Sequence, residues 1–99
     1  MTEEAKKRVF YRLHAREKMA ERRIAPADVR SVLRTGEVIE TAHPEGRPFP
    51  TRLVLGWVGQ RPLHVLVADD PAVGQYVITV YEPAIDRWEP GFRTRKDQP

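Results

Sequence analysis

The sequence predicts a single α+β domain in which two N-terminal helices pack on one face of a curled antiparallel β-sheet of about four strands. Apolar residues recur with a helical period in the first third of the 99 residues, and with a period of two from residue 38 onward. The later apolar runs are joined by short connections, which favour an antiparallel meander. The length fits one domain, with a core over about residues 8–92 and a polar tail over residues 93–99.

The first third predicts a helical hairpin. Residues 9–24 place apolar side chains at spacings of three to five, which is typical of an amphipathic helix. Residues 8–12 fit a short strand equally well, so both alternatives remain open. Pro26 suits the first turn of a second helix, which Gly36 ends at the usual capping position.

After the helices the sequence predicts strands. Residues 38–39 begin a short strand, and residues 43–50 form a loop rich in proline and glycine. Three longer strands are rich in Val, Leu, Ile and Tyr and cover residues 52–58, 62–68 and 75–82. A turn at residues 59–61 would pair Gly56 with His64, and a loop at residues 69–74 would pair His64 with Thr79.

This register sorts the strand residues onto two faces. The face expected to bury the helices is almost purely apolar and comprises Leu53, Leu55, Trp57, Leu63, Val65, Val67, Tyr76, Ile78 and Val80. The opposite face is mixed and comprises Arg52, Val54, Gly56, Val58, His64, Leu66, Val77, Thr79 and Tyr81. Because Gly56 lacks a side chain, the register predicts a hollow beside His64.

His64, Thr79 and Tyr81 around this hollow form the candidate catalytic group. A histidine titrates near neutral pH, and hydroxyl groups can orient a substrate or donate a proton, so the group suits acid–base or phosphate chemistry. A structural role explains the same residues if His64 only bonds Thr79 across the strands. In that alternative the C-terminal segment, through Trp88 and Phe92, covers the whole face.

Charge is distributed unevenly along the chain, although the net charge is only +3. Residues 1–34 hold ten Lys/Arg against five Asp/Glu, residues 35–86 hold three against seven, and residues 87–99 hold four against two. The helices and the tail are therefore basic, and a basic surface attracts phosphate backbones. A solvated helix face is the alternative explanation.

Several classes of protein are not expected. The chain has no cysteine, and its three histidines lack the spacing of metal ligands, so neither disulfides nor a metal site is predicted. No motif for a cofactor is present. The longest apolar runs are of strand length, and residues 1–8 lack the apolar segment of a signal peptide. We therefore expect a cytoplasmic protein without a cofactor or membrane span.

A resemblance adds to this interpretation. Its motifs are His14-Ala15, Met19-Ala20-Glu21-Arg22, Ile24, Asp28-Val29, Gly36-Glu37, Leu53-Val54-Leu55-Gly56, Pro62-Leu63-His64-Val65, Ile78-Thr79-Val80-Tyr81-Glu82-Pro83, Trp88 and Arg93-Thr94-Arg95-Lys96. Over residues 8–96 the chain resembles a bacterial domain family of unknown function. The element order also resembles the RelE/BrnT-like toxin fold, of which some members are ribonucleases that cut messenger RNA and pair with an antitoxin. The family's signature positions would be His14, Arg22, His64, Tyr81, Glu82 and Arg95.

Two hypotheses follow. In the first, the protein is a toxin-like ribonuclease that acts on RNA without a metal, and His64 is the general acid or base with His14, Tyr81 or Thr79 beside it. Its predicted substrate-binding residues are Arg22, Arg52, Arg95 and Glu82, of which Arg22 and Arg95 would stabilise phosphate charge in the transition state. In the second hypothesis, the protein is a non-catalytic module whose mixed sheet face binds an antitoxin, another protein or a second copy. The patch would consist of Val54, Leu66, Val77 and Tyr81.

Overall fold

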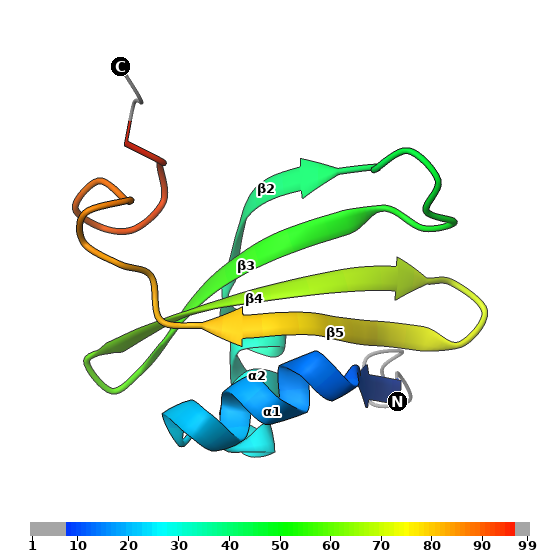
Figure 1. The fold of residues 1–99 in the computed structure, drawn as a ribbon, viewed down its shortest axis with the longest axis horizontal. Coiled ribbons are helices and arrows are strands. Elements are labelled where there is room, and N and C mark those ends of the chain that lie inside the picture. The colour runs from blue at the N-terminus through cyan, green and yellow to red at the C-terminus, as the bar shows by residue number, and fades with distance from the viewer. Residues whose placement is uncertain (1–7, 97–99) are drawn as a thin grey trace.

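A computed structural model describes residues 8–96 as two helices packed on one face of a single sheet (Figure 1). The elements are β1 (Arg8–Tyr11), α1 (Leu13–Arg22), α2 (Pro26–Thr35), β2 (Glu37–Ala42), β3 (Thr51–Val58), β4 (Arg61–Asp70) and β5 (Gly74–Tyr81). The strands lie in the order β1-β5-β4-β3-β2. Residues 82–96, here called the C-terminal arm, leave the end of β5 as an irregular segment. No helix within residues 8–96 is long and apolar enough to cross a membrane.

The α+β class, the helical hairpin and the antiparallel meander are confirmed, but the sheet has five strands and is mixed. The additional strand is β1, which runs parallel to β5. Of residues 8–12, Arg8–Tyr11 are thus a strand, and α1 begins at Leu13. Val9 and Tyr11 pack on the core while Phe10 stacks on Tyr76 from the other face, which is the alternation that a strand requires. A purely antiparallel sheet was therefore a wrong prediction.

The predicted strand register is wrong by one residue. Val58 pairs with Arg61, so the turn between β3 and β4 has two residues instead of three. Gly59 adopts a φ of 64°, the conformation that a tight hairpin turn requires and that glycine adopts without strain. As a result Leu55, and not Gly56, lies opposite His64.

The next hairpin also differs from the prediction. Asp70 pairs with Gly74, which shortens the loop between β4 and β5 to residues 71–73. A β-bulge follows, because Leu66 pairs with Thr79 whereas the next residue of β4 pairs with Val77. The extra residue in β5 changes which of its side chains face the helices.

These pairings invert the predicted faces of β3. The side chains that form the core with the helices include Val54 from β3, Leu63, Val65 and Val67 from β4, and Val77 and Val80 from β5. The prediction was right for β4 and for Val80, but wrong for Val54 and Val77. Leu53, Leu55 and Trp57 lie on the face away from the helices, because a shift of one residue moves every side chain of a strand to the other face.

Gly56 serves the packing of α2, and the hollow predicted beside His64 does not exist. A Cβ atom at Gly56 would lie 2.7 Å from Cγ2 and 2.8 Å from Cγ1 of Val32. The absent side chain therefore lets α2 approach β3 closely. Because Gly56 faces the helices, it lies on the opposite side of the sheet from the His64 imidazole.

Candidate functional site

His64 lies in the middle of the sheet, on the face away from the helices, between Leu55 and Tyr81 of the neighbouring strands. Its side chain is fully buried, with 0% of its surface exposed. Nε2 lies 2.9 Å from the carbonyl oxygen of Phe92, and a carbonyl can only accept, so Nε2–H is the donor. Nδ1 then accepts a hydrogen bond from the Tyr81 hydroxyl at 3.2 Å. Both ring nitrogens of the neutral imidazole are occupied.

Burial sets the protonation of this pair. The pKa of His64 is lowered, mainly because burial disfavours the charged imidazolium, so the ring is neutral at pH 7. The pKa of the Tyr81 hydroxyl is raised, also mainly by burial. The two groups thus form a neutral hydrogen-bonded pair.

The C-terminal arm covers His64. The Trp88 indole, which is 4% exposed, meets the imidazole edge-to-face with ring centroids 4.4 Å apart. The Arg95 guanidinium lies over the Trp88 ring, 4.7 Å from its centroid, in a cation–π contact. Arg95 also makes a bidentate ion pair with Glu40 of β2, at 2.8 and 3.1 Å. Arg95 therefore ties the arm to the edge of the sheet.

Phe92 carries the backbone group that closes the site. Its φ of 63° is uncommon for a bulky residue and stores strain of about 1–3 kcal/mol. The hydrogen bond from His64 to its carbonyl helps to hold this conformation. The adjacent Arg93 adds a surface ion pair with Glu37 at 2.7 Å, and the Phe92 ring lies 6.0 Å from that of Trp57.

The structure brings together only two of the predicted catalytic residues, His64 and Tyr81. Thr79 pairs with Leu66 instead of His64, two residues before Tyr81 along β5. His14 lies exposed on α1, on the helix-covered side of the sheet. His14 and His64 therefore lie on opposite sides of the sheet.

The predicted substrate-binding residues are dispersed, and three of the four are in ion pairs. Arg52 binds Asp69 through two hydrogen bonds of 2.6 and 3.0 Å. Arg95 binds Glu40, as described above. Glu82 accepts a hydrogen bond of 2.9 Å from Arg61. Arg22 is exposed on the last turn of α1.

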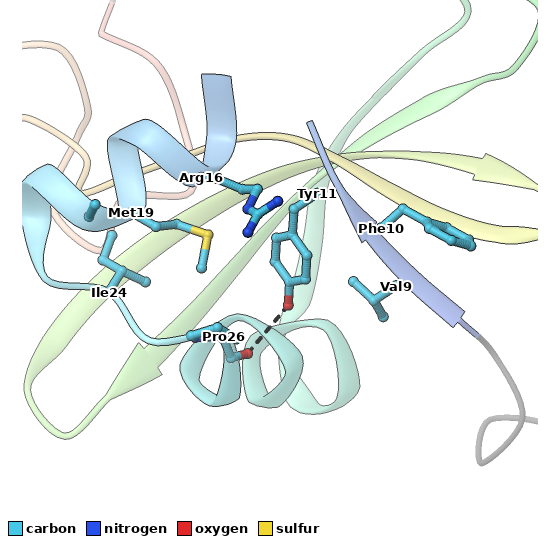
Figure 2. Close-up of a pocket in the computed structure, with 8 residues that line it drawn as sticks. Val9, Phe10, Tyr11, Arg16, Met19, Ile24 and Pro26 are labelled. Carbon is cyan, nitrogen blue, oxygen red and sulfur yellow. Dashed lines mark hydrogen bonds between the residues drawn. The ribbon is translucent and has the colours of Figure 1, made fainter. Parts of the chain in front are cut away.

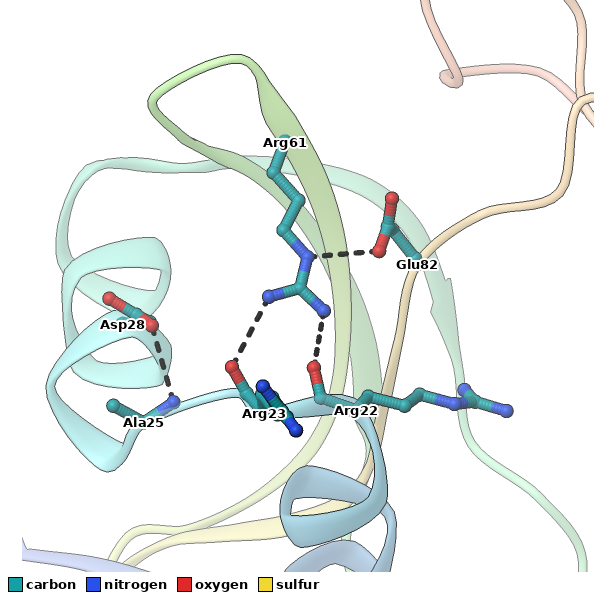
Figure 3. Close-up of polar contacts among 6 residues, drawn as sticks. All are labelled: Arg22, Arg23, Ala25, Asp28, Arg61 and Glu82. Carbon is teal, nitrogen blue, oxygen red and sulfur yellow. Dashed lines mark hydrogen bonds and ion pairs between the residues drawn. The ribbon is translucent and has the colours of Figure 1, made fainter.

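Arg61 joins the end of α1 to the start of the C-terminal arm (Figure 3). Its guanidinium donates to the carbonyl oxygens of Arg22 at 2.6 Å and of Arg23 at 3.3 Å. The same group pairs with Glu82. Because the last carbonyls of a helix have no partner within the helix, Arg61 acts as a cap. The roles of Glu82 and of the Arg22 backbone in this structure are thus structural.

A different group of cations is free of such pairing. The exposed arginines of α1, of its C-cap and of α2 form what we call the basic helical surface: Arg16, Arg22, Arg23, Arg30 and Arg34. Arg12 lies outside this surface, because its guanidinium stacks on Tyr76 on the opposite face of the sheet. The ion pairs found within residues 8–96 all use other cations, namely Lys18, Arg52, Arg61, Arg93 and Arg95. Residues 8–34 hold eight Lys/Arg against three Asp/Glu, a net charge of +5.

The spacing of these arginines would have revealed the surface. Arg30 and Arg34 are four residues apart, so they lie on one side of α2. From the sequence only Arg22 of this group was selected, although the basic charge of the helices was evident.

A groove of about 560 Å³ opens between β1, α1 and the start of α2 (Figure 2). Its lining residues are Val9, Phe10, Tyr11, Arg16, Met19, Ala20, Ile24 and Pro26. The Tyr11 hydroxyl makes a long hydrogen bond of 3.5 Å to the Pro26 carbonyl, and Arg16 extends toward the Tyr11 ring. Burial raises the pKa of the Tyr11 hydroxyl, and the positive charge of nearby Arg30 offsets part of this rise. The sequence did not indicate this groove, because it depends on β1 being a strand.

Residues 11–82 match a family described as a domain of unknown function, DUF4258. The match covers more than two-thirds of the chain. The chain belongs to the DUF4258 family. No curated protein and no solved structure matches the chain.

The region shared with DUF4258 contains the helical hairpin and the strands β2 to β5. It includes His64 and Tyr81, but it ends at Glu82, before the part of the arm that covers them. Within residues 8–96 no three or more His, Cys, Asp or Glu side chains are placed to hold a metal ion.

Proposed function

We propose that this DUF4258 protein binds single-stranded RNA through its basic helical surface, without cutting it. The observation that supports the proposal is the contrast in pairing. The arginines of the basic helical surface make no ion pair with any acid within residues 8–96, whereas the cations that pair lie mainly on the sheet and arm. When unpaired arginines neutralise phosphates, the counterions condensed on the nucleic acid are released. This release supplies most of the affinity of non-specific binding.

The environment of His64 supports binding over catalysis. A general acid or base must come within hydrogen-bond reach of the substrate. Both nitrogens of His64 are already bonded, to Tyr81 and to the Phe92 carbonyl, and Trp88 covers the ring. The pair therefore suits an anchor for the C-terminal arm.

Fluorescence anisotropy tests the proposal with a labelled single-stranded RNA of about ten nucleotides, a length within the range that single domains bind. Arg30→Gln/Arg34→Gln should weaken binding at low salt by at least about fivefold, because two phosphate contacts are lost. Arg47→Gln/Arg87→Gln is the matched control, since it removes the same charge from exposed arginines outside the basic helical surface. An equal loss of affinity in both variants would show that binding depends only on net charge and not on the basic helical surface. Absence of binding by the wild type would refute the proposal.

Metal-free RNA cleavage is a second candidate, favoured by the direct contact of His64 with Tyr81 at 3.2 Å. A neutral imidazole can accept the proton of a ribose 2′-hydroxyl, but here the arm must first move away. Labelled RNA incubated with the protein and a chelator provides the assay. Cleavage by the wild type that is lost in His64→Phe would support this candidate, and cleavage that persists in the variant would exclude His64 from the chemistry.

The structure retains only part of the apolar patch that was predicted to bind a protein partner. Val54 and Val77 face the helices, which leaves Leu66 and Tyr81 on the proposed face, where the arm lies against Tyr81's partner His64. Binding of an antitoxin or a second copy there remains a proposal. Sedimentation at micromolar concentration would support it only if Leu66→Glu dissociated a dimer or complex.

A further inference from the structure

We propose that the groove between β1, α1 and α2 holds one unstacked RNA base, while arginines beside it hold the flanking phosphates. The inference rests on the proposed function and assigns its base-binding site. The groove volume of about 560 Å³ lies within the range of pockets that take small organic groups. Its mixed lining, apolar with a few polar groups, is typical of such pockets.

Two flat side chains suit the faces of a base. The Tyr11 ring forms one wall of the groove, and the Arg16 guanidinium extends toward it from α1 (Figure 2). Proteins that bind single-stranded RNA stack bases on aromatic rings and on arginine planes. Met19 and Ile24 supply apolar contact behind these groups.

Two polar atoms suit the edge of a base. The Tyr11 hydroxyl and the Pro26 carbonyl oxygen lie 3.5 Å apart, a long separation for a hydrogen bond. A hydroxyl donates and accepts, whereas a carbonyl accepts from an exocyclic amine. A base edge presents such donors and acceptors side by side, so it can replace this weak internal contact with two shorter ones.

Charge favours a nucleotide over an acidic peptide as the occupant. Among residues 8–96 no acidic residue lines the groove, while Arg16 lines it and Arg30 lies close to Tyr11. Both cations belong to the basic helical surface, so a strand that follows that surface passes the mouth of the groove. A peptide with acidic and apolar residues satisfies the same charges but makes no use of the two flat side chains.

The test compares an RNA of about ten nucleotides with an abasic strand of the same length, which keeps the phosphates and lacks the bases. Ala20→Phe fills the groove, because Ala20 lines it and is exposed on α1. Ala27→Phe is the matched control, an identical change at an exposed position of α2 that does not line the groove.

We expect the wild type to bind the RNA at least about fivefold more tightly than the abasic strand, the low end of the stacking contribution of one base. Ala20→Phe should reduce RNA binding to the abasic level, and Ala27→Phe should leave it unchanged. Equal binding of both strands by the wild type would overturn the inference and leave the proposed function intact. Binding of neither strand would overturn both.

An acidic peptide of alternating Glu and Leu identifies the competing occupant. If it binds the wild type but not Ala20→Phe, while both strands bind alike, the groove is a peptide site and the base assignment is wrong. If Ala20→Phe binds RNA as the wild type does, the base lies elsewhere and the assignment is also wrong.

Discussion

Replacing His64 by phenylalanine tests whether this residue anchors the C-terminal arm. The variant keeps an aromatic ring against Trp88 but removes both hydrogen-bonding nitrogens. The Phe92 carbonyl, which faces the buried ring of residue 64, then loses its donor, which costs about 1–3 kcal/mol. The Tyr81 hydroxyl loses its acceptor as well, but it is half-buried and can turn to water, so its loss is about 0.5–1.5 kcal/mol.

The free energy of unfolding should therefore fall by about 1.5–4.5 kcal/mol in His64→Phe. Urea denaturation followed by tryptophan fluorescence measures it, with a lower midpoint as the expected result. Arg93→Gln is the control, because its exposed ion pair with Glu37 contributes less than about 1 kcal/mol. Trypsin should also cut the arm faster in His64→Phe than in the control. A loss of stability below about 0.5 kcal/mol would refute the anchoring role of His64.

Three further changes test the structure. Gly56→Ala should destabilise the fold by about 1–3 kcal/mol, since its Cβ would overlap Val32, and an unchanged melting temperature would contradict this packing. The pKa of His64 is lowered in the folded state, so the unfolded chain takes up the proton first, and stability should fall as pH drops below about 6.5. A pH profile identical in His64→Phe would show that another group causes the fall. Arg61→Ala should lower the unfolding free energy by about 1–2 kcal/mol by exposing two helix carbonyls, whereas Glu82→Gln should change it by less than about 1 kcal/mol, as urea denaturation can measure.

Local signals in the sequence sufficed for the helices and for the strands of the meander. Pro26 and the change from a helical period to a period of two marked the boundaries, because both act within a few residues. The strand β1 was ambiguous, because Val9 and Leu13 also fit a helical stripe. Its parallel pairing with β5 joins residues more than sixty positions apart, and no local pattern encodes such a contact.

The candidate site was harder to predict, because it depends on strand register. A turn of two residues in place of three moved Gly56 to the helix face and placed Leu55 beside His64. The β-bulge at Ile78 had the same effect on the part of β5 that precedes it. The catalytic alternative paired His64 with Tyr81, and the structural alternative placed Trp88 over this face of the sheet. That both hold at once could not be predicted, because it depends on the path of the C-terminal arm.

The salt dependence of RNA binding tests the central claim most directly. For single strands the slope of log K against log salt concentration is about −0.7 per phosphate neutralised. Arg30→Gln/Arg34→Gln should make the slope shallower by about 1.4 if each arginine contacts one phosphate, while Arg47→Gln/Arg87→Gln should keep the wild-type slope. The same slope in both variants, or a wild-type affinity that does not depend on salt, would contradict binding through the basic helical surface.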